Sequence, residues 1–379
     1  MKLKFILYSV LLSVLFVSCE KDDPVIINPY KRTVLVYLIA ENNLSSYSNQ
    51  NIRDMLNGVT KETLNNGNLL VYWDPSDKPP RLLKIDLDKH GKADTTTVKV
   101  YEEQNSASPE VVRNVINETL NNFKADSYGL VLWSHGSSWL PANYASMLRW
   151  FGQDGNNKMD IKELSSAIPD NVFDFILFDA CYMASIEVIY ELRNKASYII
   201  GSPVEILGNG FPYQLIIKPL FSTTLDLTGI CDNFYNFYDQ QTGLHRSAAV
   251  SITATEYLEE LTQVTREILN GKETEVHGLS VTNIQKLDYL ASSRILYDFD
   301  DFIKNFASEE QYINFQTALS NAIIYKEHTP KSTFVAGGSA FAIDINYFSG
   351  LSTYIPRSSY SLLNEWYREN TDWYKAVYE

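Results

Sequence analysis

The segment FDFILFDACYMASIEVIYEL, residues 173–192, decides how the rest of this sequence is interpreted. Five of its first six residues are apolar or aromatic, as in a parallel strand buried on both faces. The run ends in Asp179, Ala180 and Cys181, and apolar residues then recur at helical spacing. The pattern predicts a strand that carries an aspartate and a thiol to its C-terminal end, with a helix directly behind them.

Strand-like and helix-like segments alternate along the chain from Arg32 onward. Further strands are expected at 33–40, 68–74, 81–87, 97–102, 128–136, 196–206 and 247–255. Intervening helices, of which 108–123 is the clearest, predict an α/β fold with a mostly parallel sheet and helices on both faces. In such sheets active residues lie at the carboxyl ends of strands, where both His135 and Cys181 fall.

The character of the sequence changes near residue 255. Residues 256–269 and 296–325 are amphipathic and are predicted to be helical, and a strand-like piece follows at 350–356. We therefore expect a catalytic unit over residues 32–255 and a helical C-terminal extension over 256–379, whose final strand packs on that unit.

Composition limits the classes of protein to consider. The chain has 379 residues, 45% of them hydrophobic, and a net charge of −14, so it is globular and repels nucleic acid. Its three cysteines, Cys19, Cys181 and Cys231, form no CxxC pair, which indicates neither a disulfide framework nor a zinc site. No metal ligand set is predicted.

Residues 1–18 have the features of a secretory signal: two early lysines and then an apolar run too short to span a membrane. The segment resembles a bacterial lipoprotein signal, which would make Cys19 the lipidated residue and 19–31 a polar tether. The tether is similar to the surface-export signals of Bacteroidetes lipoproteins, which implies an outer-membrane lipoprotein exposed at the cell surface. An ordinary cleaved signal with an incidental cysteine is the alternative.

The pair His135 and Cys181 suggests nucleophilic chemistry. A thiol needs an imidazole to manage its proton and N–H donors for the oxyanion, for which the backbones of Gly136 and Cys181 are candidates. The 46-residue spacing of the pair suits one strand–helix–strand crossover. The helix after Cys181 is expected to lower the pKa of the thiol.

The same residues carry a family resemblance. LVLWSHGSSW (130–139) and 173–192 resemble the His-Gly and Asp-Ala-Cys motifs of the clostripain family of cysteine peptidases, relatives of caspases, gingipains and legumain. Residues 34–55 and 201–213 resemble further parts of that family, so the resemblance covers about 32–379. It implies a caspase-like fold.

The resemblance also implies roles for individual residues. Cys181 would be the nucleophile, His135 its acid/base partner, and Asp179 the floor of a pocket for Arg or Lys. Asn209 stands where the family commonly has a second acid, which weakens the expected basic preference. Glu205 lies in the same segment and is a candidate substrate-binding residue. Alternatively, Asp179 holds the adjacent turn through backbone hydrogen bonds.

Two further expectations come from the family. Many members are activated by cleavage between the histidine and the cysteine, where Arg149 or Lys158 could be the autoprocessing site. Some relatives use calcium, so no cofactor is required but calcium is possible. Residues 154–160 (DGNNKMD) superficially resemble a calcium loop, but they lack its sixth-position glycine and are interpreted as a turn and a helix cap.

The sequence thus predicts a cell-surface cysteine endopeptidase that acts on proteins or peptides through a thioester acyl-enzyme. The protein would attach to the membrane through its N-terminal lipid. Nucleic acid is not expected as a partner. Two alternatives stay open: a catalytically silent surface-binding lipoprotein that keeps the fold, and an acyl transferase with the same nucleophile.

Overall fold

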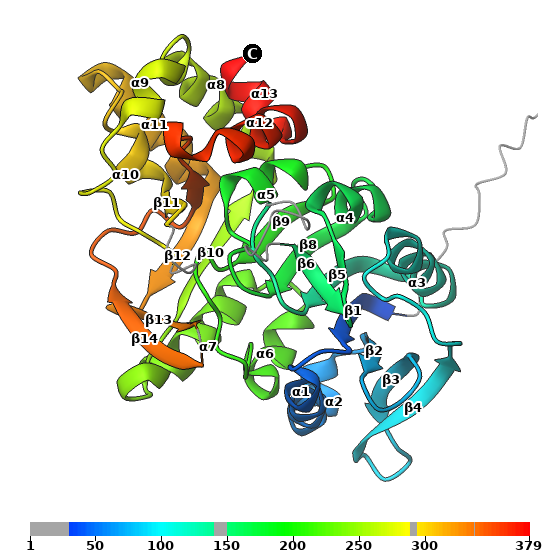
Figure 1. The fold of residues 1–379 in the computed structure, drawn as a ribbon. Coiled ribbons are helices and arrows are strands. Elements are labelled where there is room, and N and C mark those ends of the chain that lie inside the picture. Colours follow the sequence, from blue (N-terminus) through cyan, green and yellow to red (C-terminus); the bar gives the residue numbers. More distant parts are fainter. Residues whose placement is uncertain (1–29, 140–149, 289–293, 337) are drawn as a thin grey trace, which may run out of the picture.

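The computed structural model describes residues 30–139, 150–288, 294–336 and 338–379 (Figure 1). A nine-stranded sheet runs through the centre, in the order β12-β10-β9-β8-β5-β1-β2-β3-β4. Its strands are β1 (Tyr30–Ala40), β2 (Asn68–Pro75), β3 (Arg81–Leu87), β4 (Ala93–Val100), β5 (Ala125–Trp133), β8 (Phe173–Asp179), β9 (Ala196–Gly201), β10 (Ala249–Ala254) and β12 (Ile323–His328). In the described part of the chain, no helix combines the length and the apolar character needed to cross a membrane.

The five central strands, β9, β8, β5, β1 and β2, are parallel, and antiparallel strands flank them on both sides. This arrangement confirms the predicted α/β fold with a mostly parallel sheet. The central strands are apolar along their whole length because both faces of the sheet are covered. On β1, Val34, Val36 and Leu38 face one core, and Leu35, Tyr37 and Ile39 face the other.

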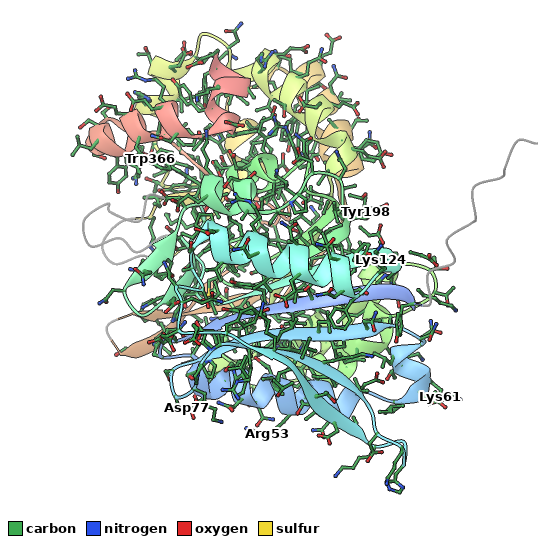
Figure 2. The ribbon with its side chains drawn as sticks, turned by 90° about the vertical axis from the view of Figure 1, so that its right-hand side faces the viewer. Arg53, Lys61, Asp77, Lys124, Tyr198 and Trp366 are labelled. Carbon is green, nitrogen blue, oxygen red and sulfur yellow. The ribbon has the colours of Figure 1, made fainter. Side chains whose placement is uncertain are left out.

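Helices cover both faces, as expected. One face is packed against α1 (Ser45–Gly58), α2 (Lys61–Leu64), α6 (Tyr213–Leu220) and α7 (Leu227–Asp239). The other contacts α3 (Pro109–Asn122), α4 (Ile161–Ala167), α5 (Ile186–Glu191), α8 (Leu258–Leu269), α11 (Glu309–Ala322) and α13 (Asp372–Tyr378). Figure 2 shows these layers, with the helix that carries Arg53 below the strands and α3, which ends just before Lys124, above them.

The C-terminal region contains more strand than the sequence predicted. The expectation of helix through 296–325 was wrong at both ends, because Leu296–Asp298 form a strand and the chain leaves α11 to add β12 to the sheet, antiparallel to β10. As an edge strand, β12 is largely exposed and lacks the apolar run of a buried strand. The predicted final strand exists as β15 (Ser352–Tyr354), but it pairs with β11 (Leu296–Asp298).

Two hairpins complete the structure. β6 (Phe151–Asp154) pairs with β7 (Asn157–Met159), and β13 (Lys331–Ala336) pairs with β14 (Ser339–Asp344). The first hairpin has its turn within 154–160, and Asp160 and Glu163 then form a capping box at α4, so this segment is the turn and helix cap that the sequence predicted. The remaining helices are α9 (Glu273–Gly278), α10 (Phe299–Ile303) and α12 (Ser361–Asn370).

Candidate active site

His135 and Cys181 lie at equivalent positions beyond two neighbouring parallel strands. β5 pairs with β8 so that Trp133 is opposite Asp179, and each candidate residue follows two positions later. Both line one cavity of about 750 Å³, together with Asp179, Glu205 and other side chains. The thiol and the imidazole, which the sequence predicted at strand ends, therefore lie at the same cavity.

The imidazole of His135 is held by Asn43, from the turn after β1. Its Nε2 lies 2.6 Å from Oδ1 of Asn43, and because an amide oxygen only accepts hydrogen bonds, Nε2 carries the proton. Nδ1 is then the basic nitrogen. Burial, and secondarily the charge of Lys158, lowers the pKa of His135 to about 4, so the ring is neutral near pH 7.

The thiol of Cys181 is in a resting, protonated state. Its Sγ lies 3.6 Å from the carbonyl oxygen of Ile206 and accepts a hydrogen bond from the Ile206 N–H at 3.3 Å. Burial first, and the charge of Glu205 second, raise the pKa of the thiol well above its ordinary value. A thiolate would therefore form as the proton passes to a base, rather than existing beforehand.

The predicted effect of the helix on Cys181 was wrong. Helix α5 begins only at Ile186 and has six residues, with Ser185 as its N-cap. The influence of a helix dipole fades within its first turn, so five residues of separation leave the thiol outside its reach. The pKa of Cys181 is raised instead of lowered.

Backbone N–H groups for an oxyanion are available at Gly136 and Cys181. Neither donates a backbone hydrogen bond among the described residues. Gly136 also permits the two strand ends to approach closely, because a Cβ there would lie 2.7 Å from the carbonyl oxygen of Cys181. Directly after the thiol, Tyr182 has a φ of 63°, an unusual value for a bulky residue and a conformation often found at functional sites.

Asp179 is buried at the C-terminal end of β8 and lines the cavity. Its Oδ2 accepts hydrogen bonds from the N–H of Phe211 and the hydroxyl of Tyr213, at 3.1 and 3.0 Å. Burial raises the pKa of its carboxyl to about 6. This placement fits both roles that the sequence left open. Oδ2 holds the neighbouring segment by hydrogen bonds, and Asp179 also lines the cavity where a substrate side chain would bind.

Glu205 lines the same cavity, whereas Asn209 does not. Oε1 of Glu205 accepts from the hydroxyl of Tyr182 and Oε2 from the N–H of Val335, each at 3.0 Å. Burial raises the pKa of Glu205 to about 7. Asn209 lines a separate hollow beside α1, and its carbonyl accepts from the side chain of Asn51.

Of the two candidate autoprocessing residues, Lys158 can be described. It lies on β7 opposite Gln153, and its ammonium lies 4.4 Å from the centre of the Trp150 ring. Arg149 and the predicted lipidation residue Cys19 lie outside the described residues.

Two residues of the site were not predicted from the sequence as functional. Asn43 contacts His135, and Trp150 lines the cavity with its ring 6.1 Å from that of His135. The polar run Glu41-Asn42-Asn43 directly after an apolar strand was a usable signal for the first, because strand ends carry active residues in such sheets. Nothing in the sequence alone indicates the second.

A thiol and an imidazole on one cavity, with free N–H groups and a buried acid, define the site of a cysteine-dependent acyl-transfer enzyme. Comparison with known proteins agrees. The family model described as the clostripain family matches residues 36–379, so the chain belongs to the clostripain family of cysteine peptidases.

Individual relatives extend this finding. Clostripain of Hathewaya histolytica is 28% identical over 220 residues, which are 49% of this chain and 41% of clostripain. An inactive zymogen of a C11 protease from Parabacteroides distasonis is 40% identical, with a TM-score of 0.85 over 94% of this chain and all of that one. A secreted C11 cysteine protease from Bacteroides thetaiotaomicron, solved with an irreversible peptide inhibitor, is 32% identical with a TM-score of 0.82, covering 92% and 98% of the two chains.

Proposed function

We propose that this protein is a cysteine endopeptidase that cleaves proteins or peptides after Arg or Lys. The observation that carries this proposal is the position of Asp179, whose buried carboxylate lines the cavity that also contains Cys181 and His135. Both of its hydrogen bonds go to Oδ2, which leaves Oδ1 for a cationic side chain. A guanidinium or ammonium bound there would be a charge-assisted partner.

The chemistry follows from the two reactive groups. Nδ1 of His135 takes the proton of the Cys181 thiol as the sulfur attacks the scissile carbonyl carbon, and the N–H groups of Gly136 and Cys181 stabilise the oxyanion. The protonated imidazole then donates to the leaving amine, and the C–N bond breaks to give a thioester. Water, deprotonated by His135, hydrolyses the thioester and restores the thiol.

The test uses matched fluorogenic peptides that end in Arg, Lys or a neutral residue. Wild type is expected to cleave the basic peptides, and Cys181→Ala to cleave none. Asp179→Asn is expected to lower kcat/KM for the basic peptides by roughly 10- to 100-fold, the effect of losing a charged hydrogen-bonded partner, and to change the neutral peptide little. Iodoacetamide labelling of Cys181 reports whether that variant keeps its site.

Other outcomes would redirect the assignment. Cleavage of the neutral peptide alone would rule out the pocket for a basic side chain but would still support a peptidase. No turnover of any peptide, even after deliberate cleavage at Arg149 or Lys158, would favour the catalytically silent binding lipoprotein. Transfer of the acyl group to an added amine in preference to water would favour the acyl transferase.

Activation by cleavage is part of the proposal. The resting thiol supports it, as does the resemblance to a structure described as an inactive zymogen. We favour Arg149 over Lys158, because cleavage at Lys158 requires the β6–β7 pair to open. Mass spectrometry of the purified active chain tests this: a new N-terminus at residue 150 is expected, and an uncut active chain would contradict the requirement.

The final part of the proposed function is attachment to the outer membrane through lipidated Cys19. It rests on the sequence of residues 1–31. A matched pair of strains would express the full chain with Cys19 or with Cys19→Ala. The first protein is expected in the membrane fraction, labelled by an alkyne fatty acid and accessible to external protease. Release of both proteins to the medium would indicate an ordinary cleaved signal.

A further inference from the structure

A hairpin from the C-terminal region supplies part of the active-site cavity. Val335 of β13 lines the cavity that also contains Cys181 and His135. The preceding residue, Phe334, is fully buried in the core, and successive side chains of a strand point to opposite faces. The side chain of Val335 is therefore directed away from the core, and the residue is 59% exposed.

The position of this hairpin is fixed by three hydrogen bonds from β13 to other segments. The N–H of Val335 donates to Oε2 of Glu205 at 3.0 Å. The N–H of Thr333 donates to Oγ of Ser247 at 2.8 Å, and its hydroxyl donates to the carbonyl of Leu244 at 2.7 Å. The hairpin lies apart from helices α12 and α13 (Figure 1), so these contacts hold Val335 at the cavity.

The strand order places Val335 on the side of the thiol opposite His135. In the sheet, β8 lies between β5 and β9. His135 follows β5 and Glu205 follows β9, so these two residues lie on opposite sides of Cys181. β10 is antiparallel to β9 and begins at the same edge of the sheet, one strand further out. The hairpin, held by Glu205 and by residues just before β10, is therefore on the side away from His135.

That side is where the acyl part of a substrate must lie. In the proposed peptidase reaction, on which this inference rests, His135 donates a proton to the leaving amine. The substrate chain after the scissile bond therefore lies next to His135. The chain before that bond continues in the other direction, past Ile206 and toward Val335.

The surface around Val335 is apolar. Ile206 and Leu207 line the same cavity and are partly exposed. A single exposed valine is ordinary on a protein surface, but three apolar side chains from two segments at one cavity indicate a binding surface. The nearby carboxylate of Glu205 is engaged at both oxygens, by the hydroxyl of Tyr182 and the N–H of Val335. An apolar side chain is therefore the partner that fits.

The distance from the thiol indicates which substrate residue binds there. Val335 contacts the segment after β9 and is held by residues before β10, which is one to two strand spacings from Cys181. Strands are about 4.8 Å apart and an extended peptide advances about 3.3 Å per residue, so the substrate covers this distance in about two residues. Side chains two residues apart point to the same face of an extended chain. The third residue before the scissile bond thus faces the cavity together with the basic residue.

We propose that Val335, Ile206 and Leu207 form an apolar subsite for the side chain of the third residue before the scissile bond. Two fluorogenic peptides that differ only at this position, Leu against Ser, test the subsite. The wild-type kcat/KM is expected to be roughly tenfold higher for the Leu peptide, the effect of burying two or more methylene groups. The same exchange at the second residue before the bond should change kcat/KM by less than about threefold, because that side chain points away from the cavity.

The variants assign this preference to the hairpin. Val335→Ala is expected to reduce the Leu-to-Ser ratio of kcat/KM to below about threefold. Val335→Glu should favour a Lys peptide over the Leu peptide, because it places a carboxylate at the same position. Val98→Ala is the matched control, since Val98 is an exposed valine on β4 that does not line the cavity, and it should keep the wild-type ratio.

Peptide binding separates the subsite from the proposed function. The affinities of the Leu and Ser peptides for Cys181→Ala, measured by fluorescence anisotropy before and after deliberate cleavage at Arg149, require no turnover. A difference of about tenfold that Val335→Ala removes in this background would support the subsite even if the wild type cleaved neither peptide. Equal affinities with equal cleavage would overturn the subsite and leave the peptidase intact. A preference for Leu that persists in Val335→Ala, or binding of neither peptide, would also overturn it.

Discussion

Among the described residues, the side chain that is hydrogen-bonded to the ring of His135 is that of Asn43. Asn43 is exposed and accepts from Nε2, and this contact decides which ring nitrogen is the base. Asn43→Ala is expected to lower kcat by roughly 10- to 100-fold, the value of a hydrogen bond of about 1.5 to 3 kcal/mol to a group that becomes charged. Tm should change little, because the side chain of Asn43 is exposed and does not fill the core.

The matched control is Asn49→Ala on α1, whose amide contacts the carbonyl of Ser45. Its kcat should remain that of the wild type. Equal kcat values in Asn43→Ala and Asn49→Ala would remove Asn43 from the positioning of His135. A fall in Tm parallel to that in kcat would make the role of Asn43 structural.

Glu205 acts on the thiol through its charge. Because its carboxylate raises the pKa of Cys181, Glu205→Gln is expected to lower that pKa and to speed iodoacetamide labelling by up to about tenfold. The pKa of Glu205 itself is raised to about 7, so the difference between the proteins should be small at pH 6 and full at pH 8. Glu256→Gln, an exposed control, should label at the wild-type rate throughout.

The sequence identified Cys181 and His135 because each follows an apolar strand, and strand ends of a parallel sheet share one edge. It could not identify the contact of Asn43 with His135, because the two residues are 92 positions apart and meet only when β1 pairs with β5. The raised pKa of Cys181 was equally hidden, since it arises from burial and from the charge of Glu205 in the folded chain.

At the scale of elements, the ends of β5 and β8 can approach closely because residue 136 is a glycine, which has no side chain. A Cβ on Gly136 would lie 2.7 Å from the Cys181 carbonyl oxygen and 2.9 Å from the Ala180 Cβ. Gly136→Ala is expected to push the two strand ends apart, to destabilise the protein by about 1 to 3 kcal/mol and to lower kcat/KM by about 100-fold or more. Urea unfolding and peptide cleavage measure the two effects.

Gly278→Ala provides the control for a glycine replacement. A Cβ at Gly278 meets nothing within 4 Å, and the residue ends α9 and is not part of the cavity lining. This variant should keep both the wild-type stability and the wild-type activity. If Gly136→Ala behaved in the same way, the close approach of the strand ends would have no functional importance.

The central parallel strands were predictable because complete burial makes them continuous apolar runs. β12 was not, since the residues of this edge strand are mostly partly or fully exposed and directly continue the helical pattern of α11. The small β6–β7 pair was also missed, because three or four residues are too few for a period to appear.

At the scale of the whole molecule, segments near the C-terminus contact residues in and behind the active-site cavity. The N–H of Val335 on β13 donates to Glu205, so a strand 130 residues later in the chain contacts a residue of the cavity. Behind Cys181, Glu187 of α5 accepts from the hydroxyl of Thr353, the N–H of Tyr354 and the hydroxyl of Tyr367. Glu187 therefore anchors β15 and Tyr367 of α12 to α5.

The charge of this anchor makes the stability of the whole fold depend on pH. Burial raises the pKa of Glu187 to about 7 despite its hydrogen bonds. A carboxyl whose folded pKa exceeds its unfolded pKa binds its proton more tightly in the folded state. The stabilisation is therefore present below the unfolded pKa of about 4.3 and is lost as the pH rises toward the folded value.

Glu187→Gln should remove that dependence, because the amide keeps an acceptor oxygen and never ionises. Between pH 5 and pH 8, the free energy of unfolding of the wild type is expected to fall relative to the variant by roughly 2 to 3 kcal/mol. Urea unfolding at both values measures this difference, and the subtraction cancels the buried acids Asp179 and Asp298, which both proteins share. Parallel profiles would mean that Glu187 stays protonated or solvated in both states, and that the C-terminal anchor is held by packing alone.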